Sequence, residues 1–135
     1  MSNNISLLDR AKFDLTLCKK TLLDFGEDDL AKDAAAYHLA QAVEKTLKFR
    51  INSYGQEYPL IHKFGKLIEF LEGLGEDIPE WLIKNSDILD EYVSKTRYSD
   101  SFVAAKRKVE ELAAFTDDLI KSYEPAEIEN QQDWK

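Results

Sequence analysis

The stretch from Ala34 to Arg50 constrains the fold more than any other part of the chain, because it contains neither Gly nor Pro and repeats apolar residues at helical spacing. With each residue turning by about 100°, one face of the predicted helix collects five apolar side chains: Ala36, Ala40, Val43, Leu47 and Ile51. Such a stripe predicts a helix that packs against other helices. Next to it runs a polar seam, which consists of Tyr37, Gln41, Glu44 and Lys48 with Lys45 beside them.

The polar seam has two interpretations, and the residues alone leave both open. It is the solvated face of the helix, or it is one wall of a ligand site. The second interpretation follows from its chemistry, because an aromatic ring, an amide, a carboxylate and two ammonium groups can together hold a base and phosphates.

Similar helical patterns cover most of the remaining chain, and short stretches rich in Gly, Pro, Ser or Asp separate them. No stretch alternates in the manner of a strand. We predict one domain over residues 1–125, an all-α antiparallel up-and-down four-helix bundle with an additional short helix, and an acidic, disordered tail over residues 126–135. The predicted helices are Ser6–Phe25, residues 27 to 54, His62–Leu74, Pro79–Thr96 and Phe102–Tyr123.

Local signals support several of these boundaries. Ser6 and Asp9 are typical of a capped helix start, Gly26 of a helix end, and the stretch from Asp77 to Glu80 of a second cap with Pro in the first turn. The residues expected in the core are Leu8, Leu15, Leu22, Phe25, Phe64, Leu67, Ile68, Leu71, Val109, Leu112, Ala113, Thr116, Leu119, Ile120 and Tyr123.

The charge pattern limits the possible partners. The formal net charge of −8 disfavours nonspecific binding to nucleic acid or to a membrane, yet residues 41–66 and 92–108 form two basic islands of net charge +3 and +4. These islands are either salt-bridge patterning on helices or parts of a binding surface. The single cysteine, Cys18, is expected to fill the core. The sequence shows neither the basic and then apolar pattern of a signal peptide nor an apolar run long enough for a transmembrane helix. It therefore predicts a cytoplasmic protein with no membrane association.

Several common catalytic or cofactor-binding sites lack their motifs. A carboxylate-bridged dimetal centre needs Glu three residues before His, and neither His38 nor His62 has it. Glycine-rich phosphate or dinucleotide loops and the Gly-x-Ser-x-Gly elbow are also missing from the sequence. No metal or cofactor is therefore implied. Arg97 is a candidate for bidentate phosphate binding, but it can also form a surface ion pair with Asp100 or Glu91. His62 either makes a local hydrogen bond at the start of a helix or has a functional role.

Three segments taken in order resemble the HEPN domain family over about residues 6–124. They are Ala-Tyr-His-x-x-Gln-x-x-Glu-Lys-x-Leu-Lys at 36–48, His-x-x-x-x-Leu at 62–67 and Leu-Asp-x-Tyr-x-x-x-x-Arg-Tyr-Ser-Asp at 89–100. The Arg-Tyr-x-Asp end resembles the members associated with nucleotidyltransferases. The resemblance implies a homodimeric helical bundle, often paired with a minimal nucleotidyltransferase in a toxin–antitoxin or substrate-binding system, with some members binding nucleotides and many acting as metal-independent ribonucleases.

In the ribonuclease members, four to six residues separate the Arg from a following His. Here the Arg would be Arg97, and the three matching positions hold Phe102, Val103 and Ala104. Without an imidazole to move the 2′-hydroxyl proton, activity drops by about 10²–10⁴-fold. The residues that the resemblance carries over are therefore binding residues rather than catalytic ones: Gln41, Lys45, Lys48, His62, Tyr92, Arg97 and Tyr98.

Three functions follow as hypotheses. The first is a noncatalytic module that binds a nucleotide or nucleotidyl substrate and works with a nucleotidyltransferase. The second is a ribonuclease with a rearranged centre, in which His62 replaces the missing His if the fold brings it near Arg97. The third is a module for dimerisation or protein interaction only.

Overall fold

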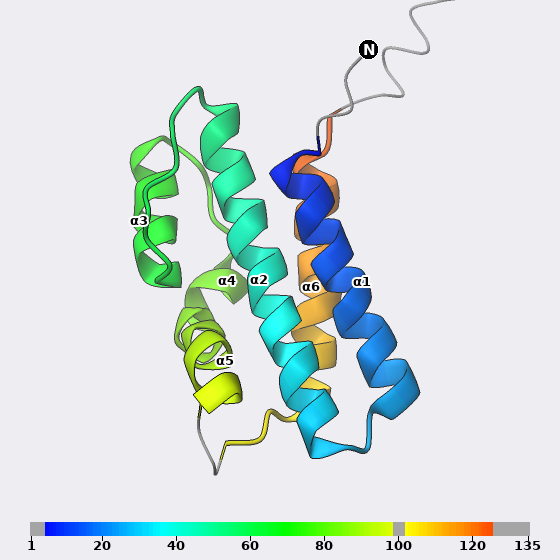
Figure 1. Ribbon diagram of the computed structural model, residues 1–135. Helices are drawn as coiled ribbons and strands as arrows, with labels where there is room; N and C mark the ends of the chain where they lie inside the picture. Colours follow the sequence, from blue (N-terminus) through cyan, green and yellow to red (C-terminus); the bar gives the residue numbers. More distant parts are fainter. Residues whose placement is uncertain (1–4, 99–101, 126–135) are drawn as a thin grey trace, which may run out of the picture.

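The computed structural model describes residues 5–98 and 102–125, with only the backbone for residues 96–98. This part of the chain contains six helices and no strand (Figure 1). They are α1 (Leu7–Phe25), α2 (Asp29–Ser53), α3 (Phe64–Gly73), α4 (Glu80–Lys84), α5 (Ser86–Tyr98) and α6 (Lys106–Tyr123). The helices pack antiparallel as a bundle, so the predicted all-α class is confirmed. The tail predicted over residues 126–135 lies outside the described residues.

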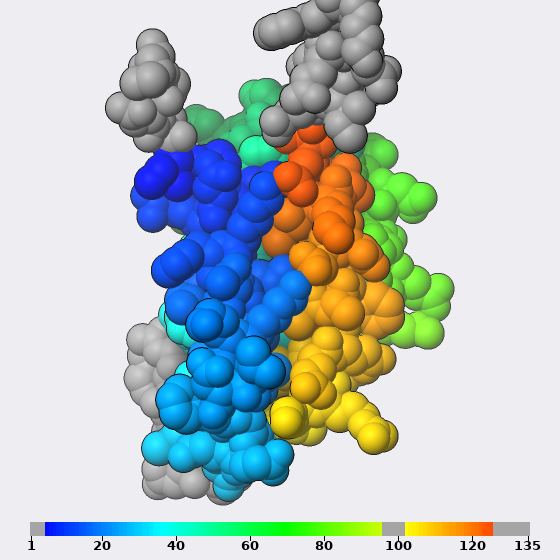
Figure 2. All heavy atoms as spheres, turned by 90° about the vertical axis from the view of Figure 1, so that its right-hand side faces the viewer, coloured from blue at the N-terminus to red at the C-terminus, as the bar shows by residue number. Residues whose placement is uncertain are grey.

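Helix α2 is the centre of the bundle, and it contacts α1, α3, α5 and α6. Its five-residue apolar stripe is fully buried, as are Ala35, Leu39, Ala42 and Thr46 on other sides of the helix. Helices α1 and α6 lie side by side and close one face of the bundle (Figure 2). Because neighbours surround α2, its polar seam is drawn partly into the protein rather than left in water.

The helix starts follow the local chemistry of the sequence. The Ser6 side chain accepts a hydrogen bond from the Asp9 backbone N–H at 3.0 Å, and the Asp9 carboxylate accepts one from the Ser6 N–H at 3.1 Å, which completes the predicted capping box. Asp28 caps α2 by accepting from the N–H groups of Leu30 and Ala31 at 2.8 and 3.1 Å. These bonds satisfy backbone donors that a helix start leaves without partners.

The predicted helix from Pro79 to Thr96 is wrong as one element, because the chain divides it at Asn85 into α4 and α5. The Asn85 amide donates to the Trp81 carbonyl at 2.6 Å, and its backbone N–H bonds the same carbonyl. A side chain that competes for backbone groups favours such a break. The expected cap from Asp77 to Glu80 is wrong too, since Pro79 stands at the N-cap without a side-chain bond.

Further boundaries differ from the prediction, and α3 begins at Phe64 rather than at His62. Helix α5 continues to Tyr98, and α6 begins at Lys106 rather than at Phe102. The predicted core is confirmed with one exception, because Phe25 is 64% exposed. Helix α1 ends at that residue, so Leu22 is the last side chain on its buried face. Cys18 is buried as expected, and burial raises the pKa of its thiol to about 12.

Among the described residues, no helix combines the length and the apolar character that crossing a bilayer requires.

Candidate functional site

A buried carboxylate on α2 joins two of the residues predicted to bind a ligand. Glu44 is 7% exposed, and its Oε2 atom accepts hydrogen bonds from Lys48 Nζ and from His62 Nδ1, each at 2.9 Å. Lys48 Nζ also lies 4.9 Å from the centre of the Tyr58 ring, a cation–π contact. We call these four residues the Glu44 cluster. It brings together α2 and the loop that precedes α3.

The position of His62 follows from how α3 begins. His62 comes two residues before α3, and the first N–H of that helix, at Phe64, donates to Asp90 Oδ1 of α5 at 3.0 Å. This bond holds the segment of His62 and Lys63 against the middle of α5. Glu44 of α2 then contacts the imidazole, and Lys48, one turn further along α2, contacts the same carboxylate oxygen.

Beside His62 the surface is hollowed, with a volume of about 440 Å³. We call this region the α5 hollow, and it is lined by His62, Lys63, Asp90, Glu91, Val93 and Ser94. Its two acids already have partners, because Asp90 caps α3 and Glu91 accepts from Lys95 at 3.2 Å. The side chain of His62 is 72% exposed. An imidazole and an ammonium group therefore stand at the edge of a hollow large enough for a small ligand.

The contact with Glu44 also indicates which ring nitrogen of His62 carries a hydrogen. An ionised carboxylate only accepts hydrogen bonds, so Nδ1 is the nitrogen that carries the hydrogen toward Glu44. Nε2 is then an acceptor in the neutral ring and a second donor in the protonated ring. The arrangement can donate to a phosphate oxygen, or it can take up a proton.

Lys45 lies in a different cluster, between α1 and α2. Asp14 of α1 accepts from Lys45 Nζ through Oδ2 and from His38 Nδ1 through Oδ1, the latter at 3.1 Å. We call these three residues the Asp14 cluster. Burial of Asp14 acts to raise its pKa, but the hydrogen bonds and charges of His38 and Lys45 outweigh it, so the pKa of this carboxyl is lowered.

The remaining predicted residues lie in three environments. Gln41 is half-buried on α2. Tyr92 is 1% exposed, its ring meets Phe102 edge-on at 6.3 Å, and burial raises its pKa to about 12. Arg97 and Tyr98 occupy the last two positions of α5, and their side chains lie outside the described residues. The structure thus brings Lys48 and His62 together and puts Lys45 elsewhere.

Local ion pairs account for much of the two basic islands. In the first, Arg50 Nε donates to Glu76 at 2.9 Å, and the guanidinium lies over the rings of Tyr54 and Tyr123 at 5.2 and 4.9 Å. In the second, Lys95, Lys106 and Lys108 each face a carboxylate within 3.6 Å. Salt-bridge patterning therefore explains many of these charges, and Lys63 is the cation of the first island that lines the α5 hollow.

Sequence reasoning missed the parts of the site that hold His62. Glu44 was recognised only as one position of the polar seam, although the i, i+4 spacing to Lys48 indicates their pairing. Asp90 was noted only as a motif position and Tyr58 not at all, because the Asp90 cap on α3 and the Tyr58 ring over Lys48 both depend on tertiary packing. Within the described part of the chain, no group of three His, Cys, Asp or Glu side chains is arranged to hold a metal ion.

Comparison with known proteins gives the family. No curated protein sequence and no solved structure matches the chain significantly. The sequence model of the HEPN domain family matches residues 6–125. These residues span α1 to the end of α6 and include both clusters and the α5 hollow. The chain therefore belongs to the HEPN domain family.

Proposed function

We propose that this HEPN protein is a noncatalytic module that binds the phosphates of a nucleotide or nucleotidyl substrate in the α5 hollow. The observation that carries the proposal is the single oxygen Glu44 Oε2, which accepts from both Lys48 and His62 at 2.9 Å. A buried carboxylate with two donors holds the imidazole in one orientation. A donor fixed before the ligand arrives loses less conformational entropy on binding.

The hollow offers hydrogen-bond donors to an anion, while its lining also holds two carboxylates. Lys63 and His62 stand at its edge, while Asp90 and Glu91 are occupied by a helix cap and by Lys95. Helix α5 reaches Arg97 three residues after Ser94, which lines the hollow. In this proposal the Arg97 guanidinium adds a bidentate phosphate contact, and Tyr98 stacks on the base.

The partner is part of the same proposal. We infer from the family resemblance that the protein is a homodimer and works with a minimal nucleotidyltransferase, in the manner of a toxin–antitoxin pair. Co-expression of this chain with a nucleotidyltransferase encoded next to it tests the pairing. Co-elution of the two chains on size-exclusion chromatography is expected, and separate elution at micromolar concentration would contradict it.

Calorimetric titration with ATP, GTP and a short single-stranded RNA tests the binding. We expect the Kd for at least one ligand to rise about 10-fold in His62→Gln and in Lys63→Ala, because each loses a charge-assisted hydrogen bond. Lys66→Ala is the matched control, since Lys66 is an exposed cation in the first turn of α3 and does not line the hollow. Absence of heat with all three ligands would reject the proposal, as would equal losses in Lys63→Ala and Lys66→Ala.

A second candidate function, a metal-independent ribonuclease, is favoured by the same His62–Glu44 contact. A carboxylate that holds Nδ1–H leaves Nε2 as the basic nitrogen. In this reaction Nε2 takes the proton of a ribose 2′-hydroxyl and the 2′-oxygen attacks the neighbouring phosphorus. The P–O5′ bond breaks and the 5′-oxygen takes a proton from water, so the product ends in a 2′,3′-cyclic phosphate. Arg97 would stabilise the charge on the phosphoryl oxygens.

RNA cleavage in the presence of EDTA distinguishes the two functions. The ribonuclease function would be supported if the wild type cleaves RNA and if the cleavage rate falls by about 10²-fold or more in His62→Gln and in Arg97→Ala. Intact RNA after hours at micromolar protein would reject it. In that case, Val103→His is informative, because Val103 is 48% exposed and is one of the three positions where ribonuclease relatives carry His. If this variant cleaves RNA, the missing imidazole is the reason that the wild type has no ribonuclease activity.

The third hypothesis, a module for interaction only, is favoured by exposed apolar side chains. Phe13, Leu23 and Leu30 of α1 and α2 are 64%, 81% and 81% exposed, and exposed apolar residues mark a contact surface where they form one contiguous patch. If the Arg-Tyr end of α5 forms the dimer contact, Arg97→Ala raises the monomer fraction in analytical ultracentrifugation. An unchanged dimer would exclude that role for Arg97.

A further inference from the structure

The start of α3 takes its capping hydrogen bond from another helix. Lys63 stands at the N-cap position, and because its side chain can only donate hydrogen bonds, it makes no side-chain cap. The first N–H of the helix, at Phe64, instead donates to Oδ1 of Asp90 on α5 at 3.0 Å. The two residues are 26 positions apart in the chain. A bond that usually belongs to one helix therefore joins α3 to α5.

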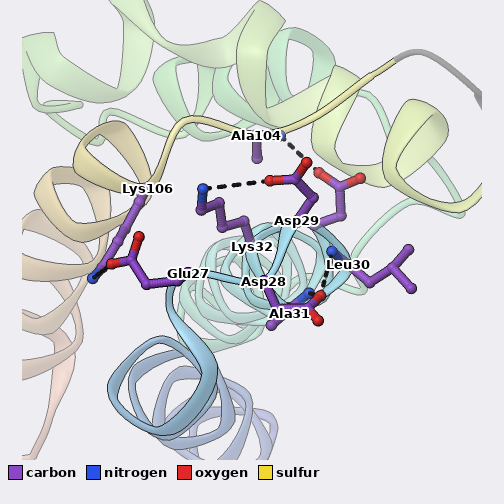
Figure 3. A network of polar contacts seen from close by, with 9 residues as sticks. Glu27, Asp28, Asp29, Leu30, Ala31, Lys32, Ala104 and Lys106 are labelled. Atoms are coloured by element: carbon purple, nitrogen blue, oxygen red, sulfur yellow. Dashed lines mark hydrogen bonds and ion pairs between the residues drawn. The ribbon is translucent and has the colours of Figure 1, made fainter.

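The start of α2 shows the ordinary arrangement for comparison. Asp28 stands at the N-cap there, and its own carboxylate accepts from the N–H groups of Leu30 and Ala31 (Figure 3). Such a local cap fixes the first turn of its own helix. The cap supplied by Asp90 does this too, and in addition it fixes where that turn lies relative to α5.

Both sides of the Asp90 bond are held by packing. Phe64 is fully buried, and on α5 the side chains of Leu89 and Tyr92 are 0% and 1% exposed. Asp90 itself is half-buried, and its backbone carbonyl accepts from Ser94 Oγ at 3.2 Å. Groups carried by packed helices are placed more precisely than groups on loops. The bond therefore holds the backbone of Phe64 at a defined position beside α5.

The same carboxylate has two opposing effects on an anion in the α5 hollow. His62 and Lys63, the imidazole and the ammonium group at the edge of the hollow, directly precede Phe64 in the chain. A bond that fixes Phe64 also limits where these two donors can lie. Asp90 is itself part of the lining, however, and a negative charge there repels a phosphate.

We propose that Asp90 is a positioning residue for phosphate binding in the α5 hollow. Through the backbone of Phe64 it sets the place of His62 and Lys63, and this effect outweighs the repulsion between its carboxylate and the ligand. Asp90 does not contact the ligand in this scheme. The binding part of the inference rests on the proposed function, whereas the conformational part does not.

Calorimetric titration with ATP and GTP separates position from charge. Asp90→Ala removes both the charge and the capping bond, and the Kd should rise about 5-fold or more, the scale of one lost helix cap. Asp90→Asn removes the charge but keeps a carbonyl oxygen that can accept from Phe64, so its Kd should not exceed the wild-type value. If Asp90 acts only as a repulsive charge, Asp90→Ala binds at least as tightly as the wild type, and this result would overturn the proposal.

Two control variants complete the titration. Glu91→Gln removes the other carboxylate of the hollow and leaves the Asp90 bond in place, so its Kd should not exceed the wild-type value. Asp28→Ala removes the cap of a different helix and does not line the hollow, so its Kd should be unchanged. An equal rise in Asp28→Ala and Asp90→Ala would mean that the loss is one of general stability and would overturn the positioning role.

Hydrogen exchange of the free protein tests the conformational part without a ligand. Asp90→Ala is expected to speed amide exchange at Phe64 by about 5- to 10-fold, and Asp90→Asn should restore most of the protection. Asp28→Ala should leave Phe64 unchanged and speed exchange at Leu30 and Ala31 instead.

The two measurements fail in different ways. Unchanged exchange at Phe64 in Asp90→Ala would overturn the conformational part, and faster exchange with an unchanged Kd would overturn the link to binding. If the wild type binds neither nucleotide nor the short RNA, the proposed function fails together with that link. The exchange result then still decides whether Asp90 fixes the start of α3.

Discussion

The Glu44 and Asp14 clusters are built from the same groups and differ in what surrounds them. Each has a buried carboxylate that accepts from one lysine and from the Nδ1 atom of one histidine. In the Asp14 cluster both partners come from α2, and both are about one-third exposed. In the Glu44 cluster the lysine side chain is 9% exposed, whereas the histidine side chain is 72% exposed.

This difference separates a structural contact from a candidate site. The Asp14 cluster ties α1 to α2, and its histidine lines none of the hollows described above. In the Glu44 cluster, the buried lysine compensates the buried carboxylate, and the exposed imidazole stands at the edge of the α5 hollow. The same three groups can thus serve the fold or a ligand, and access to the imidazole decides which.

The largest expected effect is on stability, and it sharpens the comparison. Glu44→Leu leaves Lys48 almost fully buried without its carboxylate, which should lower the free energy of unfolding by about 3–5 kcal/mol. Asp14→Leu leaves Lys45 and His38, both of which reach water, so a loss of about 1 kcal/mol or less is expected. Urea denaturation followed by circular dichroism measures both. Equal losses would show that the two carboxylates are equivalent.

The second effect concerns binding. His62→Gln should weaken binding of the preferred nucleotide or RNA by about 10-fold or more, because a charge-assisted hydrogen bond is lost. His38→Gln should leave the affinity unchanged, since His38 is held between α1 and α2. Calorimetric titrations of the two variants under identical salt give the comparison. Similar losses in both would mean that the α5 hollow is not the site.

The third effect is the pH dependence of stability. The pKa of Asp14 is lowered in the folded protein, so the unfolded state binds a proton more readily as the pH falls. Its stabilising contribution is present above the ordinary carboxyl pKa of 3.8 and is lost as the pH falls through the lower, folded-state value. Asp14→Asn should flatten the stability profile below pH 4, measured by thermal unfolding from pH 7 to pH 2. A variant with the wild-type acid profile would contradict the sign of this shift.

The smallest effect tests the ring over Lys48. Tyr58→Leu removes a cation–π contact at 4.9 Å and should cost about 0.5–1 kcal/mol in unfolding free energy. Tyr58→Phe is the control, because it keeps a ring over the ammonium group. If both variants lose the same amount, the hydroxyl rather than the ring face is responsible.

Helical periodicity predicted much of the fold, for a physical reason. Side chains on one face of a helix recur every three or four residues, so the stripe from Ala36 to Ile51 and the matching face of α6 were found without coordinates. The prediction failed where tertiary or side-chain contacts compete with propensity. Asn85 interrupts a helical pattern with its own amide. The Ala104 N–H donates to Asp33 of α2 instead of joining α6, which begins four residues later than predicted.

The candidate site divides in the same way. The sequence by itself determined the all-α bundle, the HEPN family and the presence of Lys48, His62 and Arg97, because these depend on residue type and on spacing along the chain. Only the tertiary structure decided that Lys48 and His62 share one oxygen of Glu44 while Lys45 belongs to Asp14. Neighbouring positions on one helix face different partners, and burial by those partners decides which charges remain available to a ligand.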